Sequence, residues 1–222
     1  MRIVEKTLYK YEELNDRAKQ RARECYLEGG LDYSWWEFCY DDFARVAEIL
    51  GIDLSQRAVP LMNGKCRYEP EIYFSGFYHQ GSGSSFCGTY GYAKGAVAKI
   101  KEYAPQDSEL HCIAQGLQDV QRRHFYRLIA DITSVSDYYI RVEVEDITSV
   151  SDYYIRVEVE DSENRYRDIG DAEDDVRGLM NDFNDWMFKC LQDEYEYLTS
   201  DEAVEESIID NEYEFDEYGN WV

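Results

Sequence analysis

The stretch DITSVSDYYIRVEVE occupies residues 131–145, and the same fifteen residues follow without a substitution at 146–160. Within YYIRVEVE, apolar residues such as Ile140 alternate with charged residues such as Arg141. A period of two places the two kinds of side chain on opposite faces of a strand, so each copy predicts one half-buried β-strand. The Ser136–Asp137 pair predicts a turn before that strand.

Two identical copies are too few and too short for a repeat architecture, which shows approximate similarity over at least about three units of 20–50 residues. The two copies have accumulated no differences, which indicates a recent duplication, or an artefact of cloning or assembly. The second copy could extend the sheet by a hairpin, form an exposed loop, or compete with the first copy for one register. We expect it to add no function, because loops tolerate insertion.

Periodicity and cap residues predict the other elements. Helices are expected from Asn15 to Gly29, Trp35 to Leu50, Ala93 to Tyr103, Ser108 to Phe125, Asp171 to Leu198 and Ser200 to Ile209. Strands are expected within 3–11, around Asn63-Gly64, on both sides of the Gly/Ser turn in 71–92, and in the tail. Short turns between strands favour antiparallel pairing. Without a linker boundary, we expect one α+β domain over residues 1–222, with helices packed on one face of an antiparallel sheet.

The charge of the chain restricts its partners. Acidic residues outnumber basic ones by 47 to 23, which gives a formal net charge of −24. This argues against direct nucleic-acid binding, which needs clustered Lys and Arg, and against anionic membrane surfaces. It favours a soluble protein with a cationic partner, or with no partner at all. The sequence does not predict the oligomeric state.

The sequence also predicts a compartment. The amino terminus has no apolar signal-peptide core, and no apolar run approaches the ~18 residues of a membrane span. Six cysteines occur without a C-x-x-C pair, at Cys25, Cys39, Cys66, Cys87, Cys112 and Cys190. These observations predict a cytoplasmic protein with free thiols.

The carboxyl-terminal region 168–222 carries the strongest charge signal. It holds nineteen acids, opposed only by Arg177 and Lys189. On a helix this is about one acid per ~4 Å, close to the ~3.4 Å between phosphates of one DNA strand. The region therefore predicts an acidic partner-binding face, although a solvated helix that keeps the protein soluble has the same pattern. The proposed contact residues are Asp171, Glu173, Asp174, Asp175, Asp182, Asp185, Asp193, Glu194, Glu196, Asp201, Glu202, Glu205 and Glu206.

A second candidate surface is the Gly/Ser hairpin within residues 71–92. Its proposed contact residues are Tyr78, His79, Ser82, Ser84 and Phe86. His79 and Cys87 flank the tip and are the best pair for a nucleophilic site, but a reactive thiolate needs electropositive surroundings. No His or Cys spacing indicates a metal site, and no motif indicates a cofactor. We therefore predict no catalytic residues, no metal and no cofactor.

Three segments of the chain resemble a known family. They are YEELNDRAKQRAR at 11–23, YFSGFYHQGSGSSF at 73–86 and YLTSDEAVEESIIDNEYEF at 197–215. The chain is similar there to small bacteriophage and prophage proteins that are labelled as hypothetical or as an antitoxin of a toxin–antitoxin stability system. The resemblance implies a phage accessory protein in the host cytoplasm, and it transfers no catalytic role. The tandem copies at 131–160 depart from the family pattern, in which one hairpin is expected.

Three functions are compatible with these features. The first is an acidic inhibitor that binds a basic nucleic-acid-handling host protein, as an anti-CRISPR, anti-restriction or antitoxin-like factor. The second is a small enzyme that uses His79 and Cys87. The third is a structural or regulatory phage component without an inhibitory target. The one-sided charge of region 168–222 favours the first.

Overall fold

The structure is a computed structural model that describes residues 7–31, 34–62, 64–79, 81–136, 153–163 and 169–222. The chain packs into two compact units, described separately here. The terminal unit comprises Met1–Trp36 and Leu191–Val222, and the central unit comprises Glu37–Cys190. One long helix contributes residues to both units. The expectation of a single domain over 1–222 therefore stays a prediction.

The terminal unit pairs the two ends of the sequence. Its elements are β1 (Tyr9–Lys10), the 3₁₀ helix η1 (Tyr11–Glu13), α1 (Asp16–Glu28), α6 (Asp201–Asp210) and β10 (Glu214–Phe215). Asn15 and Ser200 cap α1 and α6 as the sequence predicts, each accepting a backbone N–H of the first turn. Strand β10 pairs antiparallel with β1, which confirms the predicted tail strand.

A small core holds the terminal unit together. It buries Tyr11, Leu14, Ala18, Ala22, Val204, Ile208 and Phe215. Residues 3–6 of the predicted first strand lie outside the described residues. In the described part the strand covers only Tyr9–Lys10, because Tyr11 begins η1 and its ring packs in this core. Gly219 has φ +84°, and a Cβ there would lie 2.0 Å from the Ala18 carbonyl oxygen. Only glycine therefore allows this close approach of the tail to α1.

The central unit is built on an antiparallel sheet of order β2-β7-β8-β9. Its strands are β2 (Ile52–Leu54), β7 (Gly88–Gly91), β8 (Leu128–Ser136) and β9 (Tyr153–Asp161). Two hairpins accompany it, β3 (Gln56–Pro60) with β4 (Cys66–Pro70) and β5 (Ile72–Phe74) with β6 (Ser84–Phe86). Both were predicted from their turn residues. The sequence missed β2 as a strand, because three residues are too few to show a period.

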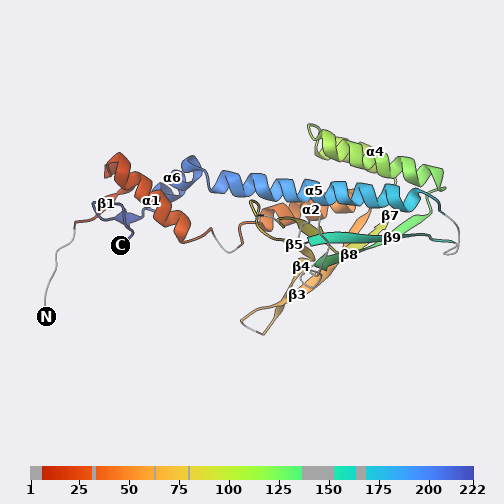
Figure 1. Cartoon of the computed structure of the whole chain (residues 1–222), viewed down its shortest axis with the longest axis horizontal. Helices are drawn as coiled ribbons and strands as arrows, with labels where there is room; N and C mark the ends of the chain where they lie inside the picture. Colours follow the sequence, from red (N-terminus) through yellow and green to blue (C-terminus); the bar gives the residue numbers. More distant parts are fainter. Residues whose placement is uncertain (1–6, 32–33, 63, 80, 137–152, 164–168) are drawn as a thin grey trace, which may run out of the picture. The chain divides into compact units, whose positions relative to one another are not determined.

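Helices of the central unit cover the sheet. They are α2 (Glu37–Leu50), α3 (Ala96–Tyr103), α4 (Ser108–Arg123) and the first part of α5 (Ala172–Leu198). Figure 1 shows α4 and α5 running along the same side of the sheet. The core between these layers is aromatic: the Phe183 ring lies 5.6 Å from Phe86 and 5.8 Å from Trp186, and Trp186 lies 5.5 Å from Phe43. The predicted α+β class, an antiparallel sheet with packed helices, is confirmed.

Both copies of the repeated segment contribute to a single hairpin. Strand β8 contains 131–136 from the first copy, and β9 contains 153–160 from the second, in a register that runs from Leu128 opposite Asp161 to Ser136 opposite Tyr153. The predicted alternation is confirmed in β9, where Ile155 and Val157 are buried. Ser136 is the last residue of β8, so the predicted turn at Ser136–Asp137 would begin there, and it stays a prediction. The first-copy strand and Asp137 lie outside the described residues.

Candidate functional site

Acids predicted to form one partner-binding face are shared between the two units. The central unit contains Asp171, Glu173, Asp174, Asp175, Asp182 and Asp185. The terminal unit contains Asp193, Glu194, Glu196, Asp201, Glu202, Glu205 and Glu206. Each unit therefore carries its own acidic group. A carboxylate that already forms an ion pair within the chain is less available to a partner than one that does not.

In the central unit, arginines neutralise the acids at the start of α5. Arg177 pairs with Glu173 and, at 2.7 Å, with Asp174 one turn before it. Arg123 at the end of α4 lies 2.5 Å from Asp175. These three carboxylates already have cationic partners, so a ligand would have to displace an arginine to bind them.

In the terminal unit, Arg23 joins α1 to α6. Its guanidinium lies 3.2 Å from Asp201 and 2.6 Å from Glu205, and it donates to the Tyr11 hydroxyl at 2.8 Å. The Tyr11 hydroxyl in turn donates to Glu205 at 2.7 Å. Burial, and then this bond to a carboxylate, raise the pKa of Tyr11. Asp201 and Glu205 therefore stabilise the fold of this unit.

Further along α5, the central unit holds carboxylates without a compensating cation. Asp182 and Asp185 are exposed and lie one turn apart, and within the described residues neither they nor Glu109 of α4 form an ion pair. Desolvation raises the pKa of the Asp185 carboxyl, and the nearby charges of Asp182 and Glu109 raise it further. The second contribution, from the two neighbouring carboxylates, indicates a local negative potential that a cation would relieve. Asp171, just before α5, is also exposed.

The terminal unit holds a second uncompensated group. Residues 191–222 contain twelve acids and no Lys or Arg. In the described chain, the exposed Asp193, Glu202 and Glu206 form no ion pair, whereas Glu196 accepts a hydrogen bond from the Gln192 side chain at 2.9 Å. Glu194 is half-buried.

The Gly/Ser hairpin exposes only part of the surface that the sequence predicted. Tyr78 and His79 are exposed at its tip, where the His79 N–H donates to the Ser82 hydroxyl at 3.0 Å. Ser84 and Phe86 are buried, so their assignment as contact residues is wrong. The Ser84 hydroxyl bonds Asn184 of α5 at 3.0 Å, because β6 is the strand that packs under this helix.

The geometry around Cys87 does not favour a nucleophile. The Ser134 N–H donates to the Cys87 sulfur at 3.2 Å, and burial raises the pKa of the thiol. A reactive cysteine needs the opposite shift. No hydrogen bond joins Cys87 to His79 among the described residues.

Other sites were sought across the described chain. No group of three or more His, Cys, Asp or Glu side chains there is placed to hold a metal ion. Of the helices that the structure describes, none is both long enough and apolar enough to span a bilayer.

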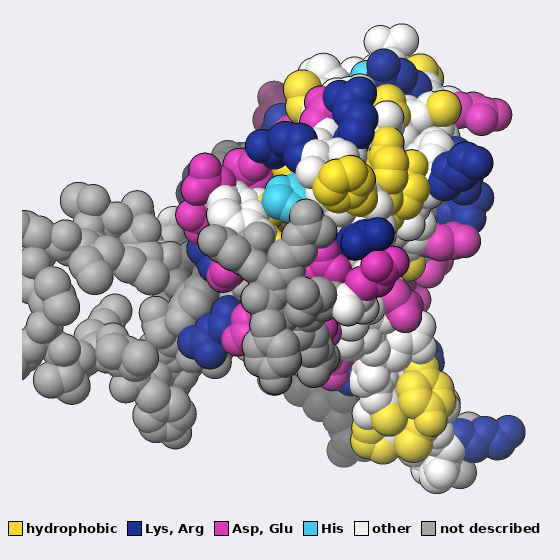
Figure 2. All heavy atoms as spheres, turned by 90° about the vertical axis from the view of Figure 1, so that its right-hand side faces the viewer, with side chains coloured by type: hydrophobic (Ala, Val, Ile, Leu, Met, Phe, Trp, Pro, Cys, Tyr) yellow, Lys and Arg dark blue, Asp and Glu magenta, His cyan; other side chains and the backbone are white. Residues whose placement is uncertain are grey.

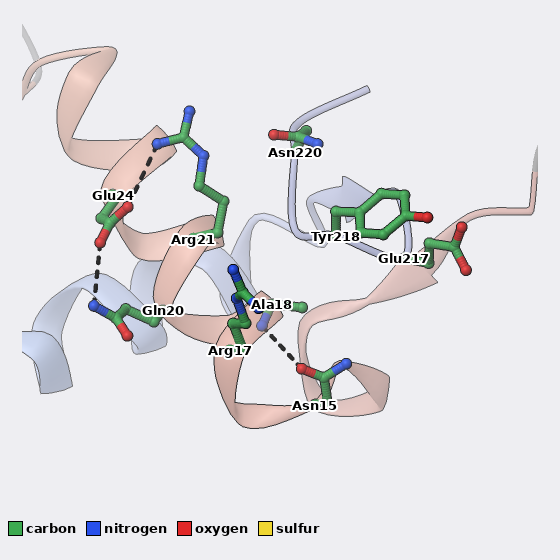
Figure 3. Close-up of a pocket in the computed structure, with 9 residues that line it drawn as sticks. All are labelled: Asn15, Arg17, Ala18, Gln20, Arg21, Glu24, Glu217, Tyr218 and Asn220. Atoms are coloured by element: carbon green, nitrogen blue, oxygen red, sulfur yellow. Dashed lines mark hydrogen bonds and ion pairs between the residues drawn. The ribbon is translucent and has the colours of Figure 1, made fainter.

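A polar hollow of about 620 Å³ lies in the terminal unit between α1 and the tail (Figure 3). Arg17 and Arg21 line it from α1, opposite Tyr218 and Asn220. Glu24 lies in the same wall and forms an ion pair with the Arg21 guanidinium at 3.4 Å. Because acidic and basic side chains both line the hollow, it does not favour a ligand of one charge over the other.

Sequence reasoning missed a basic cluster at the turn from α4 to β8. The segment RRHFYR at 122–127 places three arginines around two aromatic residues. The Tyr126 ring lies 4.4 Å from Tyr92, and the Arg127 guanidinium lies 6.0 Å from the Phe125 ring. On the face drawn in Figure 2, yellow hydrophobic side chains lie among dark-blue Lys and Arg. The interleaving of basic and aromatic residues was the available signal, and the average charge of −24 obscured it.

Fold and surface together define an α+β protein whose described surface is rich in charged side chains. The chain belongs to the family described as "Domain of unknown function (DUF8835)", whose model matches residues 35–201. No curated protein and no solved structure matches the chain.

Proposed function

We propose that this protein binds a basic, nucleic-acid-handling protein and inhibits it by occupying its nucleic-acid site. The observation that carries the proposal is the uncompensated carboxylate group of Asp182, Asp185 and Glu109, with its raised pKa at Asp185. A Lys or Arg brought against this group would form ion pairs without first breaking an internal one.

The geometry of the helix also supports mimicry of nucleic acid. Asp182 and Asp185 are three residues apart on α5, a rise of ~4.5 Å, which is comparable to the spacing of phosphates along one strand. In the terminal unit, α6 adds Glu202 and Glu206 at a spacing of four. The proposed setting is the host cytoplasm, in a phage or prophage context, as the resemblance of the sequence implies.

The test begins with a pull-down. Tagged full-length protein would be incubated with host lysate, and bound proteins identified after low-salt and high-salt washes. We expect one basic nucleic-acid enzyme that salt releases and competing DNA or RNA displaces. Its activity should fall when the protein is added. A partner that stays bound at high salt, or that nucleic acid does not displace, contradicts the proposal.

Matched variants locate the contact. Replacing Asp182 and Asp185 by Asn should weaken capture of the enzyme and its inhibition together. The control replaces Asp41 by Asn and Glu102 by Gln, two exposed acids on α2 and α3, which changes the net charge equally. Equal losses in both variants would mean that overall charge, and not this group, drives binding.

A further inference from the structure

The turn between α4 and β8 holds two aromatic residues in a strained backbone. Phe125 has φ +58° and Tyr126 has φ +62°, and these are the only consecutive non-glycine residues with positive φ in the described chain. L-residues with a Cβ avoid this left-handed region. Glycine or asparagine would adopt this backbone conformation at lower cost. The backbone conformation therefore does not explain why Phe and Tyr occupy these positions.

Hydrogen bonds around Gln121 hold the strained turn in place. The buried Gln121 side chain bonds both backbone groups of Leu128, donating to its carbonyl at 2.7 Å and accepting its N–H at 3.2 Å. The Tyr126 N–H donates to the Gln121 carbonyl at 2.7 Å. Gln121 therefore holds the backbone on both sides of the turn.

Those aromatic side chains add little to the core. Phe125 is 67% exposed and Tyr126 is 43% exposed, and the Tyr126 ring lies 4.4 Å from the ring of Tyr92, which is also exposed, at a tilt of 38°. Strain together with exposure indicates residues kept for contact with something outside the chain.

The surrounding charge indicates what that partner is. Arg122, Arg123 and Arg127 belong to the turn, and the exposed Lys94, two residues beyond Tyr92, forms no ion pair with a described residue. Each arginine pairs with one surface acid, at 2.6 Å, 2.5 Å and 3.0 Å respectively. Exposed pairs of this kind are weak, so a phosphate can take the place of the carboxylate.

We propose that the aromatic–basic turn, residues 122–127 with Tyr92 and Lys94, binds single-stranded nucleic acid. Bases stack on the rings of Phe125 and Tyr126, and backbone phosphates pair with Arg122, Arg123 and Lys94. Screening limits the effect of the net negative charge, because exposed charges farther than a Debye length of ~8 Å are largely screened at physiological ionic strength. The proposal departs from the expectation, drawn from net charge, of no direct nucleic-acid contact. It does not rest on the proposed function.

The test is fluorescence anisotropy of a labelled 12-nucleotide single strand, thymidine or uridine, titrated with the full chain at 50 mM salt. Replacing Phe125 and Tyr126 by Asn keeps residues that tolerate the left-handed region. We expect this double variant to bind at least about tenfold more weakly, since each stacked base contributes strongly. Its thermal unfolding should be unchanged or shifted upward. Replacing Phe38 by Asn, an 83% exposed aromatic on α2, is the matched control and should bind normally.

A second variant tests the phosphate contacts. Replacing Arg122 and Arg123 by Gln should lower the slope of log affinity against log salt by about 1.4, the value for two phosphates of a single strand. No binding by the wild-type chain at 50 mM salt overturns the proposal. Equal competition by a 12-residue polyglutamate overturns it in favour of an acidic protein partner. Self-association that disappears in the Phe125 and Tyr126 variant overturns it in favour of a second copy of this chain.

Discussion

Removing one copy of the duplicated segment should leave the fold intact and make it more stable. Deleting residues 138–152 joins Asp137 to Tyr153, and deletion of 131–145 gives the same chain because the copies are identical. The register of β8 and β9 makes this possible. The last pair of the register, Ser136 with Tyr153, would be given up to the loop. Val135 pairs with Tyr154, so eighteen residues now separate the two, and three would separate them after the deletion. A three-residue connection is a common hairpin loop.

The size of the effect follows from loop closure. For a flexible loop the closure cost grows as (3/2)RT ln n, so a sixfold shorter connection stabilises the hairpin by about 1.6 kcal/mol. For a chain of this length, that corresponds to a rise in Tm of roughly 3–6 °C. Urea unfolding would measure the stability, and hydrogen exchange of peptides covering 128–136 and 153–161 would measure the pairing.

The stability of the deletion variant shows whether the extra copy contributes to the fold. If the variant loses stability, or if β8 amides lose protection from exchange, the second copy contributes to the fold and the register argument is wrong. A scrambled sequence of the same fifteen residues, inserted after Asp137 of the deletion variant, is the control. It should return the stability to the wild-type level, because length alone sets the cost.

Three further predictions concern amino-acid substitutions. Gly219→Ala should destabilise the protein by roughly 2 kcal/mol or more in urea unfolding, since its Cβ would meet a carbonyl oxygen at 2.0 Å; Gly64→Ala, with positive φ and open space, should cost only about 1 kcal/mol. Asp185→Asn should stabilise the protein at pH 7. The folded state raises the pKa of Asp185, so it binds that proton more tightly than the unfolded state; the advantage of Asn should shrink as pH falls through this raised pKa and should be lost below the ordinary value of 3.8. A gain that grows with acidity would refute this. Replacing Phe125 and Tyr126 by Asn should raise the free energy of unfolding by about 1 kcal/mol, and a clear loss would show that the rings stabilise the turn.

Local elements could be predicted because their signals are local. The cap at Asn15, the buried stripe of α2 and the Asn63-Gly64 turn each depend on residues a few positions apart. Ser84 and Phe86 show where this reasoning fails. They read as part of an exposed hairpin, yet β6 is covered by α5, which follows it by about a hundred residues. Burial of that kind depends on packing between distant segments, which no local pattern records.

The sequence by itself determined the α+β class, most helix boundaries and the excess of acid, because periodicity, caps and composition are properties of the chain. Only the tertiary structure decided which acids remain unneutralised. Asp175 and Asp185 look alike in sequence, but α4 brings Arg123 to the first and Glu109 to the vicinity of the second. Likewise, only the register showed that two copies supply one hairpin. Electrostatic pairing and strand pairing act through space, so the positions of distant segments decide them.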